Sequence, residues 1–83
     1  MDSAIAFGKV LRKLRKEAGL TQEQLGFEAN LQRIHISLFE LGTNQPTLNS
    51  ILKLGKALKI PAKDIVGLVE AELPKQKKKG SAT

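Results

Sequence analysis

The chain has 83 residues, with 14 Lys and Arg against 8 Asp and Glu, one histidine and no cysteine. This length allows one small domain with a thin core, and the cysteine and histidine counts exclude disulfides and Cys- or His-rich metal sites. No apolar run approaches the roughly 18 residues of a membrane span, so we expect a cytoplasmic protein with no membrane contact, no metal and no cofactor.

The basic charge of the chain is unevenly distributed. The net charge is +6, but residues 1–73 hold ten basic and eight acidic side chains, whereas the last ten residues, PKQKKKGSAT, hold four lysines and no acid. A second basic cluster consists of Lys9, Arg12, Lys13, Arg15 and Lys16. Such clusters favour nucleic acid or anionic membranes as partners, although on charge alone a solvated surface explains them equally well.

Apolar residues recur at helical spacing and predict five helices, at residues 3–18, 22–29, 32–41, 48–59 and 62–72. Gly19 suits the left-handed end of the first helix, and Thr21 with Gln24 forms a capping-box pattern at the start of the second. Asn30 tolerates the left-handed conformation of a tight turn. No segment alternates as a strand would, so the predicted fold class is all-α.

The two C-terminal helices are expected to bury apolar stripes. On the fourth helix the stripe consists of Leu48, Ile51, Leu52, Gly55 and Leu58. The fifth helix has more apolar positions than one stripe needs, namely Ile65, Val66, Leu68 and Val69. In so small a chain this excess predicts a dimer interface, with a monomeric core as the alternative. Pro74 is expected to end the ordered domain and to leave residues 74–83 as a disordered basic tail.

The second and third predicted helices are close enough to form a helix-turn-helix, whose second helix enters the DNA major groove in DNA-binding proteins. Here the chain resembles the Cro/lambda-repressor-like regulators, called the XRE family, and among them the restriction–modification controller proteins. The resemblance spans residues 10–69 and rests on LRKLRKEAGLTQEQL, ISLFELG and PTLNSILKLGKAL, in this order and spacing. It implies a compact five-helix lambda-repressor-like DNA-binding domain over residues 1–73.

The resemblance also implies roles for individual residues. Positions that read bases in relatives are occupied by Arg33, Ile34, His35, Ser37 and Leu38. Positions at the DNA phosphates are occupied by Gln22, Arg15, Gln32, Thr43, Asn44 and Gln45. Arg15 and Glu40 match a salt bridge that links the first helix to the third.

Helical geometry supports the assignment on the third helix. If Ile36 and Phe39 face the core, a rotation of about 100° per residue keeps Arg33, Ser37 and Leu38 away from it. Arg33, in the first turn, is placed to donate two hydrogen bonds to O6 and N7 of a guanine.

The reading face of this helix is unusually apolar. Relatives often have polar residues where this chain has Leu38 and Leu41, and Ser or Thr where it has Ile34. This composition favours contacts with thymine methyl groups or with a protein. His35 is either a DNA contact or an ordinary surface residue.

These patterns and the resemblance predict a nucleoid-associated bacterial or phage transcriptional regulator, either a restriction–modification controller or a phage or prophage repressor, which binds a palindromic operator in double-stranded DNA as a homodimer. Residues 32–41 would be the recognition helix, and the lysine tail either adds attraction to phosphates or is inert. The alternative is an antitoxin that represses its own operon and binds a toxin, or another protein such as RNA polymerase, through a second surface. An enzyme is not expected, because the chain has no paired carboxylates, no nucleophile with an adjacent base and no phosphate-cradling glycine loop.

Overall fold

Five helices account for the regular secondary structure of residues 2–76, the part of the chain that the computed structural model describes. They are α1 (Ser3–Glu17), α2 (Gln22–Ala29), α3 (Arg33–Glu40), α4 (Leu48–Leu58) and α5 (Ala62–Gln76). The predicted all-α fold of five helices is confirmed. The predicted limits of α1, α3 and α4 differ from the observed ones by a single residue, which is the usual spread at helix ends.

Residues close to one another in the sequence form the helix ends. The hydroxyl of Thr21 accepts a hydrogen bond from the Gln24 backbone N–H at 3.0 Å, and the Gln24 amide oxygen accepts one from the Thr21 N–H at 2.9 Å. Asn30 ends α2 in the left-handed conformation, with φ of 58°. Both features were predicted, because each depends only on a local pattern of residue types.

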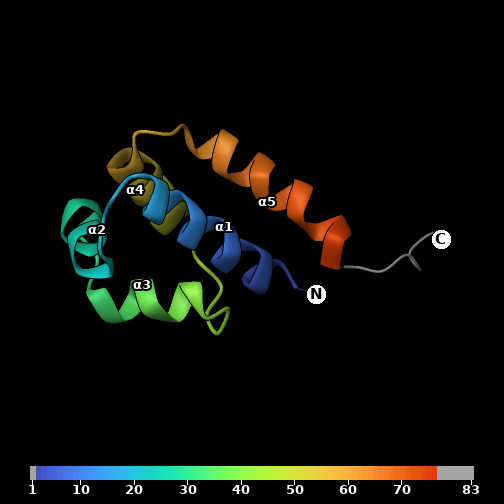
Figure 1. Cartoon of the computed structure of the whole chain (residues 1–83), viewed down its shortest axis with the longest axis horizontal. Helices are drawn as coiled ribbons and strands as arrows, with labels where there is room; N and C mark the ends of the chain where they lie inside the picture. The colour runs from blue at the N-terminus through green and yellow to red at the C-terminus, as the bar shows by residue number, and fades with distance from the viewer. Residues whose placement is uncertain (1, 77–83) are drawn as a thin grey trace.

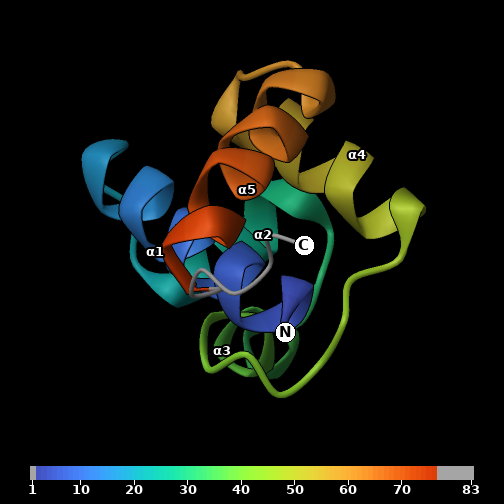
Figure 2. The ribbon, with the colours of Figure 1, turned by 90° about the vertical axis from the view of Figure 1, so that its right-hand side faces the viewer.

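The first helix lies in the middle of the domain (Figure 1). It packs against α3 on one side and α5 on the other, while α2 contacts α3 and α4, and α4 contacts α5. Figure 2 shows the same arrangement from a second direction, with α3 at one edge and α4 and α5 toward the opposite edge. Because α3 lies at an edge, one of its faces is open to solvent.

The core draws on every helix. Each contributes one large side chain that is completely buried, and these are Leu11, Leu25, Ile36, Leu54 and Ile65. Removing each from water stabilises the fold by about 1.5–3 kcal/mol. The rings of Phe7 and Phe39 meet edge to face, with centroids 5.9 Å apart and planes at 83°. This geometry suits the aromatic quadrupole and fixes α1 against α3.

The buried stripe of α4 is only partly the predicted one, because Gly55 and Leu58 are buried and Ile51 packs against the core as predicted. Leu54 is fully buried, whereas Leu48 is 69% exposed and Leu52 is 52% exposed. The buried face follows Ile51, Leu54 and Leu58, which are separated by three and four positions. The prediction was wrong in including Leu48 and Leu52 and in omitting Leu54. Two leucines are therefore left on the surface.

The predicted end of the fifth helix at residue 72 was also wrong, because α5 continues to Gln76, while the predicted domain limit at residue 73 stays a prediction. Proline within a helix removes one backbone donor and crowds the carbonyl four residues before it, but α5 extends only two residues beyond Pro74. Residues 77–83, and with them most of the predicted lysine tail, lie outside the described residues.

Candidate nucleic-acid interface

Helices α2 and α3 form the predicted pair, joined by a short turn at residues 30–32. The turn is closed by a hydrogen bond of 2.8 Å from the Leu31 N–H to the Gly26 carbonyl. Gly26 has no room for a side chain, since a Cβ there would lie 2.8 Å from the Leu31 carbonyl oxygen. The left-handed Asn30 and the missing Cβ of Gly26 therefore bring α3 directly onto the end of α2.

The outward face of α3 starts at its first turn. Arg33 and His35 are exposed, and Ile34 is 51% exposed. Ser37 and Leu38, one turn further on, are half-buried. The structure thus brings all five predicted base-contacting residues onto one short helix, with the three most accessible in its N-terminal turn.

Glu40, at the other end of α3, is held by two neighbouring helices. Arg15 of α1 donates from Nε to Glu40 Oε2 at 2.6 Å and from Nη2 to Oε1 at 3.0 Å. Gln22 of α2 donates from its amide nitrogen to Oε1 at 3.1 Å. The third guanidinium nitrogen of Arg15 donates to the Leu20 carbonyl at 2.8 Å. One carboxylate therefore connects α1, α2 and α3, and it is only 2% exposed.

Hydrogen bonding by Glu40 raises the pKa of the Arg15 guanidinium above its usual value, against the opposing effect of burial. Only 11% of the Arg15 side chain is exposed, and all three of its nitrogens donate within the domain. Arg15 therefore has a structural role as the partner of Glu40, and its predicted contact with a DNA phosphate stays a prediction. Gln22 is half-buried, and one of its amide hydrogens is already used by Glu40.

Gly8 sets the distance between α1 and α3. A Cβ at this position would lie 2.5 Å from the Phe39 carbonyl oxygen and 2.8 Å from that of Glu40. No side chain fits there without a shift of the backbone. The close approach places Arg15, two turns along α1, within reach of Glu40. The sequence interpretation did not include this role for Gly8, because it depends on the packing of distant segments.

The loop between α3 and α4 is fixed to the start of α1. Gly42 begins it in the left-handed conformation, with φ of 77°. The Ser3 hydroxyl donates to the side-chain oxygen of Gln45 at 3.1 Å. Thr43 is exposed and Asn44 is half-buried, but the Thr43 N–H already donates to the Leu38 carbonyl at 3.1 Å. The side chains of the loop are therefore available to phosphates, whereas the backbone N–H of Thr43 is not.

Gln32 is exposed at the N-cap position of α3, and its side chain makes no capping hydrogen bond. The Gln32 side chain therefore accepts no hydrogen bond from the backbone N–H groups of the first turn of α3. This agrees with its weak capping propensity. Its predicted phosphate contact stays a prediction.

The four apolar residues predicted for a dimer interface are separated by the fold. Ile65 is 1% exposed and belongs to the core of its own chain, so the prediction for this residue was wrong. Val69 is half-buried, and Leu68, 45% exposed, borders a groove between α5 and α1. Val66, 42% exposed, lies two residues from Leu68 and thus points to another side of α5. The excess of apolar residues on α5 is therefore partly explained by the monomer.

Phe27 is an exposed residue that the sequence interpretation missed. It lies on α2 and is 83% exposed, more than any other large apolar side chain in the described residues. The signal was available, because Phe27 follows the buried Leu25 by two positions and so points about 200° away from it. The described residues hold no cluster of His, Cys, Asp and Glu suited to a metal ion, and none of their helices has the length and apolarity of a membrane span.

Comparisons with known proteins identify relatives of this chain. The helix-turn-helix family model matches residues 11–65, which include all of α2, α3 and α4. The chain is 36% identical over 75 residues to the control protein C.BamHI of Bacillus amyloliquefaciens, covering 89% of this chain and 93% of that protein. It is 33% identical over 72 residues to the control protein C.MunI of a Mycoplasma species, covering 86% and 97%.

Solved structures of controller proteins are also similar to this chain. The restriction–modification controller protein C.AhdI from Aeromonas hydrophila is 39% identical, with a TM-score of 0.73 over 75% of this chain and 94% of that chain. The wild-type controller protein C.Esp1396I is 27% identical, with a TM-score of 0.79 over 88% of this chain and 96% of that chain. The similarity therefore extends to nearly the whole length of these relatives.

Proposed function

This chain belongs to the helix-turn-helix family, as a DNA-binding transcription regulator of the restriction–modification controller type, and we propose that it binds a palindromic operator as a homodimer. In this proposal α3 enters the major groove and its first turn reads base edges. The observation that supports the proposal is that one end of α3 is fixed to the rest of the domain and the other end is open to solvent. Its C-terminal end is fixed through Glu40 to α1 and α2, while the first turn is exposed.

Arg33 is the main polar reader in this proposal. Its side chain is exposed at the N-terminal end of α3, where recognition helices contact bases. The guanidinium can donate two parallel hydrogen bonds to a guanine. His35, also exposed, lies two residues further on and serves as a contact at the groove edge.

Ile34 gives the reading surface its apolar part. Its side chain is 51% exposed, which is sufficient for contact with a thymine methyl group. Leu38 is half-buried and supports a smaller contact of the same kind. We therefore expect each half-site to combine a guanine, opposite Arg33, with at least one thymine beside it.

Phosphate contacts complete the interface. Gln22 and Gln32 stand at the starts of α2 and α3, and the side chains of Thr43, Asn44 and Gln45 extend from the loop after α3. Helix N-termini and neutral amides are common donors to phosphate oxygens. These residues position the domain on the duplex and carry no sequence information themselves.

The surface proposed for dimerisation includes α4 as well as α5. Gly55 on α4 faces the start of α5, since a Cβ there would lie 3.5 Å from Ala62 Cα. Leu52 and Leu48 precede Gly55 by three and seven positions and share its side of α4, while Val66 follows Ala62 by one turn. We call Leu48, Leu52 and Val66 the α4–α5 face. These three exposed residues supply the apolar contact that a twofold dimer needs.

A second candidate function is that of an autorepressor with a protein partner, such as an antitoxin. The observation in its favour is the exposure of Phe27 and Leu41, at 83% and 70%. Neither side chain belongs to the α4–α5 face or to the first turn of α3. The similarity to controller proteins favours the first proposal.

The test is selection of bound duplexes from a random pool at near-physiological salt, together with the solution mass of the protein. An inverted repeat with half-sites about 34 Å apart, bound by a protein of twice the chain mass, supports the proposal. A single half-site bound by a monomer overturns the dimeric part. Salt-sensitive binding without any enriched sequence overturns the operator-binding part and favours the second candidate.

A further inference from the structure

Four cations on α1 take no part in the interface described above. Lys9, Arg12, Lys13 and Lys16 are all exposed. Each of them lies three or four positions from two of the others, so together they form one stripe along the helix. We call this set the α1 stripe. The fifth cation of the cluster, Arg15, is buried and points to Glu40 instead.

The α1 stripe takes part in neither of the ion pairs described for residues 2–76. These pairs join Arg15 to Glu40 and Lys63 to Asp64. Like charges three or four positions apart on a helix repel each other and destabilise it. Binding of an anion along the stripe would remove this repulsion.

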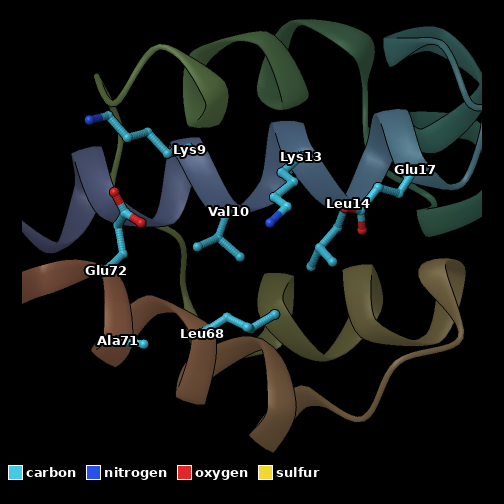
Figure 3. A pocket seen from close by; sticks show the side chains of 8 residues that line it. All are labelled: Lys9, Val10, Lys13, Leu14, Glu17, Leu68, Ala71 and Glu72. Atoms are coloured by element: carbon cyan, nitrogen blue, oxygen red, sulfur yellow. The ribbon is translucent and has the colours of Figure 1, made fainter. Parts of the chain in front are cut away.

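The position of the α1 stripe follows from the neighbours of α1 on either side. Gly8 and Arg15 mark the face of α1 that packs on α3. Val10 and Leu14 mark the opposite face, because they line a groove of about 320 Å³ between α1 and α5. The stripe lies on the exposed side of α1 between these two faces, and Lys9 and Lys13 themselves line the groove, together with Glu17 and Glu72. Figure 3 shows Lys9 and Lys13 on α1, with α3 on one side and α5 on the other.

We propose that the α1 stripe binds the phosphate backbone of the duplex that flanks the bases contacted by α3. From Lys9 to Lys16 it extends about 10 Å along the helix axis. Each strand of B-DNA carries one charge per about 3.4 Å of its axis, so this length faces about three phosphates of one strand. The stripe offers four cations to these phosphates. It contains no other polar side chain that could contact a base edge. It therefore adds affinity without sequence preference, and it depends on flanking DNA. This inference rests on the proposed operator binding.

The experiment compares two duplexes that contain the selected operator. One ends at its outermost base pairs, and the other continues for about 15 base pairs on each side. The variant carries Lys9→Gln, Arg12→Gln, Lys13→Gln and Lys16→Gln. The control variant carries Lys53→Gln, Lys56→Gln, Lys59→Gln and Lys63→Gln, which removes the same charge from α4, α5 and the turn between them, toward the edge opposite α3. Dissociation constants are measured as a function of salt concentration.

For the wild-type protein we expect a log–log salt slope that is steeper by about 2 or more on the long duplex, since each neutralised phosphate contributes about 0.9. The stripe variant should lose this difference and bind both duplexes with the slope that the wild type shows on the short one. The control variant should keep the difference. Melting temperatures of all three proteins verify that they are folded.

Equal slopes for the wild type on both duplexes would overturn the inference, as would an unchanged difference in the stripe variant. In either case the wild type still binds the operator, so the proposed function stands. If the control variant loses the difference as well, net charge and not the stripe is responsible, and the inference fails. Failure of the wild type to bind any selected duplex would instead contradict the proposed function.

Discussion

Arg15 and Glu40 are 25 positions apart in the sequence and meet through two hydrogen bonds, with the Arg15 Nε donating at 2.6 Å. The pair joins the central helix α1 to the end of α3. Because both side chains are nearly buried, the fold contains two charges that depend on each other. A buried ion pair contributes little net stability, but removal of one partner leaves the other charge uncompensated.

Replacement Glu40→Ala should therefore destabilise the domain by about 3 kcal/mol or more, because Arg15 loses its counter-ion and Gln22 loses its acceptor. The free energy of unfolding from urea denaturation measures the effect. Glu28→Ala, on the exposed face of α2, is the matched control and should change stability by less than about 0.5 kcal/mol. An equal, small effect of both substitutions would show that the pair is not structural.

Gly8→Ala should separate α1 from α3. The added methyl group would lie 2.5 Å from the Phe39 carbonyl oxygen, so the backbone must shift, at a cost of about 1–3 kcal/mol. Gly67→Ala is the control, because a Cβ at Gly67 meets no atom within 4 Å. That change should stabilise α5 by about 0.5–1 kcal/mol. Melting curves that shift in the same direction for both variants would refute the packing role of Gly8.

Local sequence patterns account for much of this fold. The capping box of Thr21 and Gln24 and the left-handed Asn30 depend on neighbouring residues only, and both were found as predicted. The buried face of α4 depends instead on where α5 lies. Leu48, Leu52 and Leu54 are equally apolar, and periodicity alone could not decide between them.

The candidate site was predictable to a similar extent. The apolar pair Ile36 and Phe39 determines which way α3 faces, so the exposure of Arg33 followed from the sequence. The close contact of Gly8 with α3 has no local signature, because it arises where segments 31 positions apart meet. Burial of Arg15 could not be read from its place in a basic cluster either, since its neighbours Arg12 and Lys16 are exposed.

Arg33→Ala should weaken specific operator binding by about 1–3 kcal/mol, which is roughly a 5- to 150-fold rise in the dissociation constant. The reason is the loss of two hydrogen bonds to one guanine, so the preference at that base position should relax. Binding curves with the operator and with random duplex, at one salt concentration, measure both effects. Lys56→Ala, which removes one exposed charge from α4, should leave the preference intact. An equal loss on both duplexes after Arg33→Ala would make this residue a phosphate contact.

A charge placed on the α4–α5 face should dissociate the proposed dimer. Leu52→Glu and Val66→Glu alter side chains that are already half exposed, so the monomer should stay folded. In a twofold contact each substitution occurs twice and brings two like charges together, which should raise the dimer dissociation constant by at least about tenfold. Sedimentation equilibrium measures the constant directly.

Two further substitutions localise the contact. Leu41→Glu is the control, because this leucine is 70% exposed but lies at the end of α3, outside the α4–α5 face, and self-association should be unaffected. Leu68→Glu examines the groove between α1 and α5. If Leu68→Glu dissociates the dimer while Leu52→Glu and Val66→Glu do not, the two chains meet at the groove. The recognition helices would then be held at a different spacing, and the operator half-sites found by selection would differ accordingly from one turn of DNA.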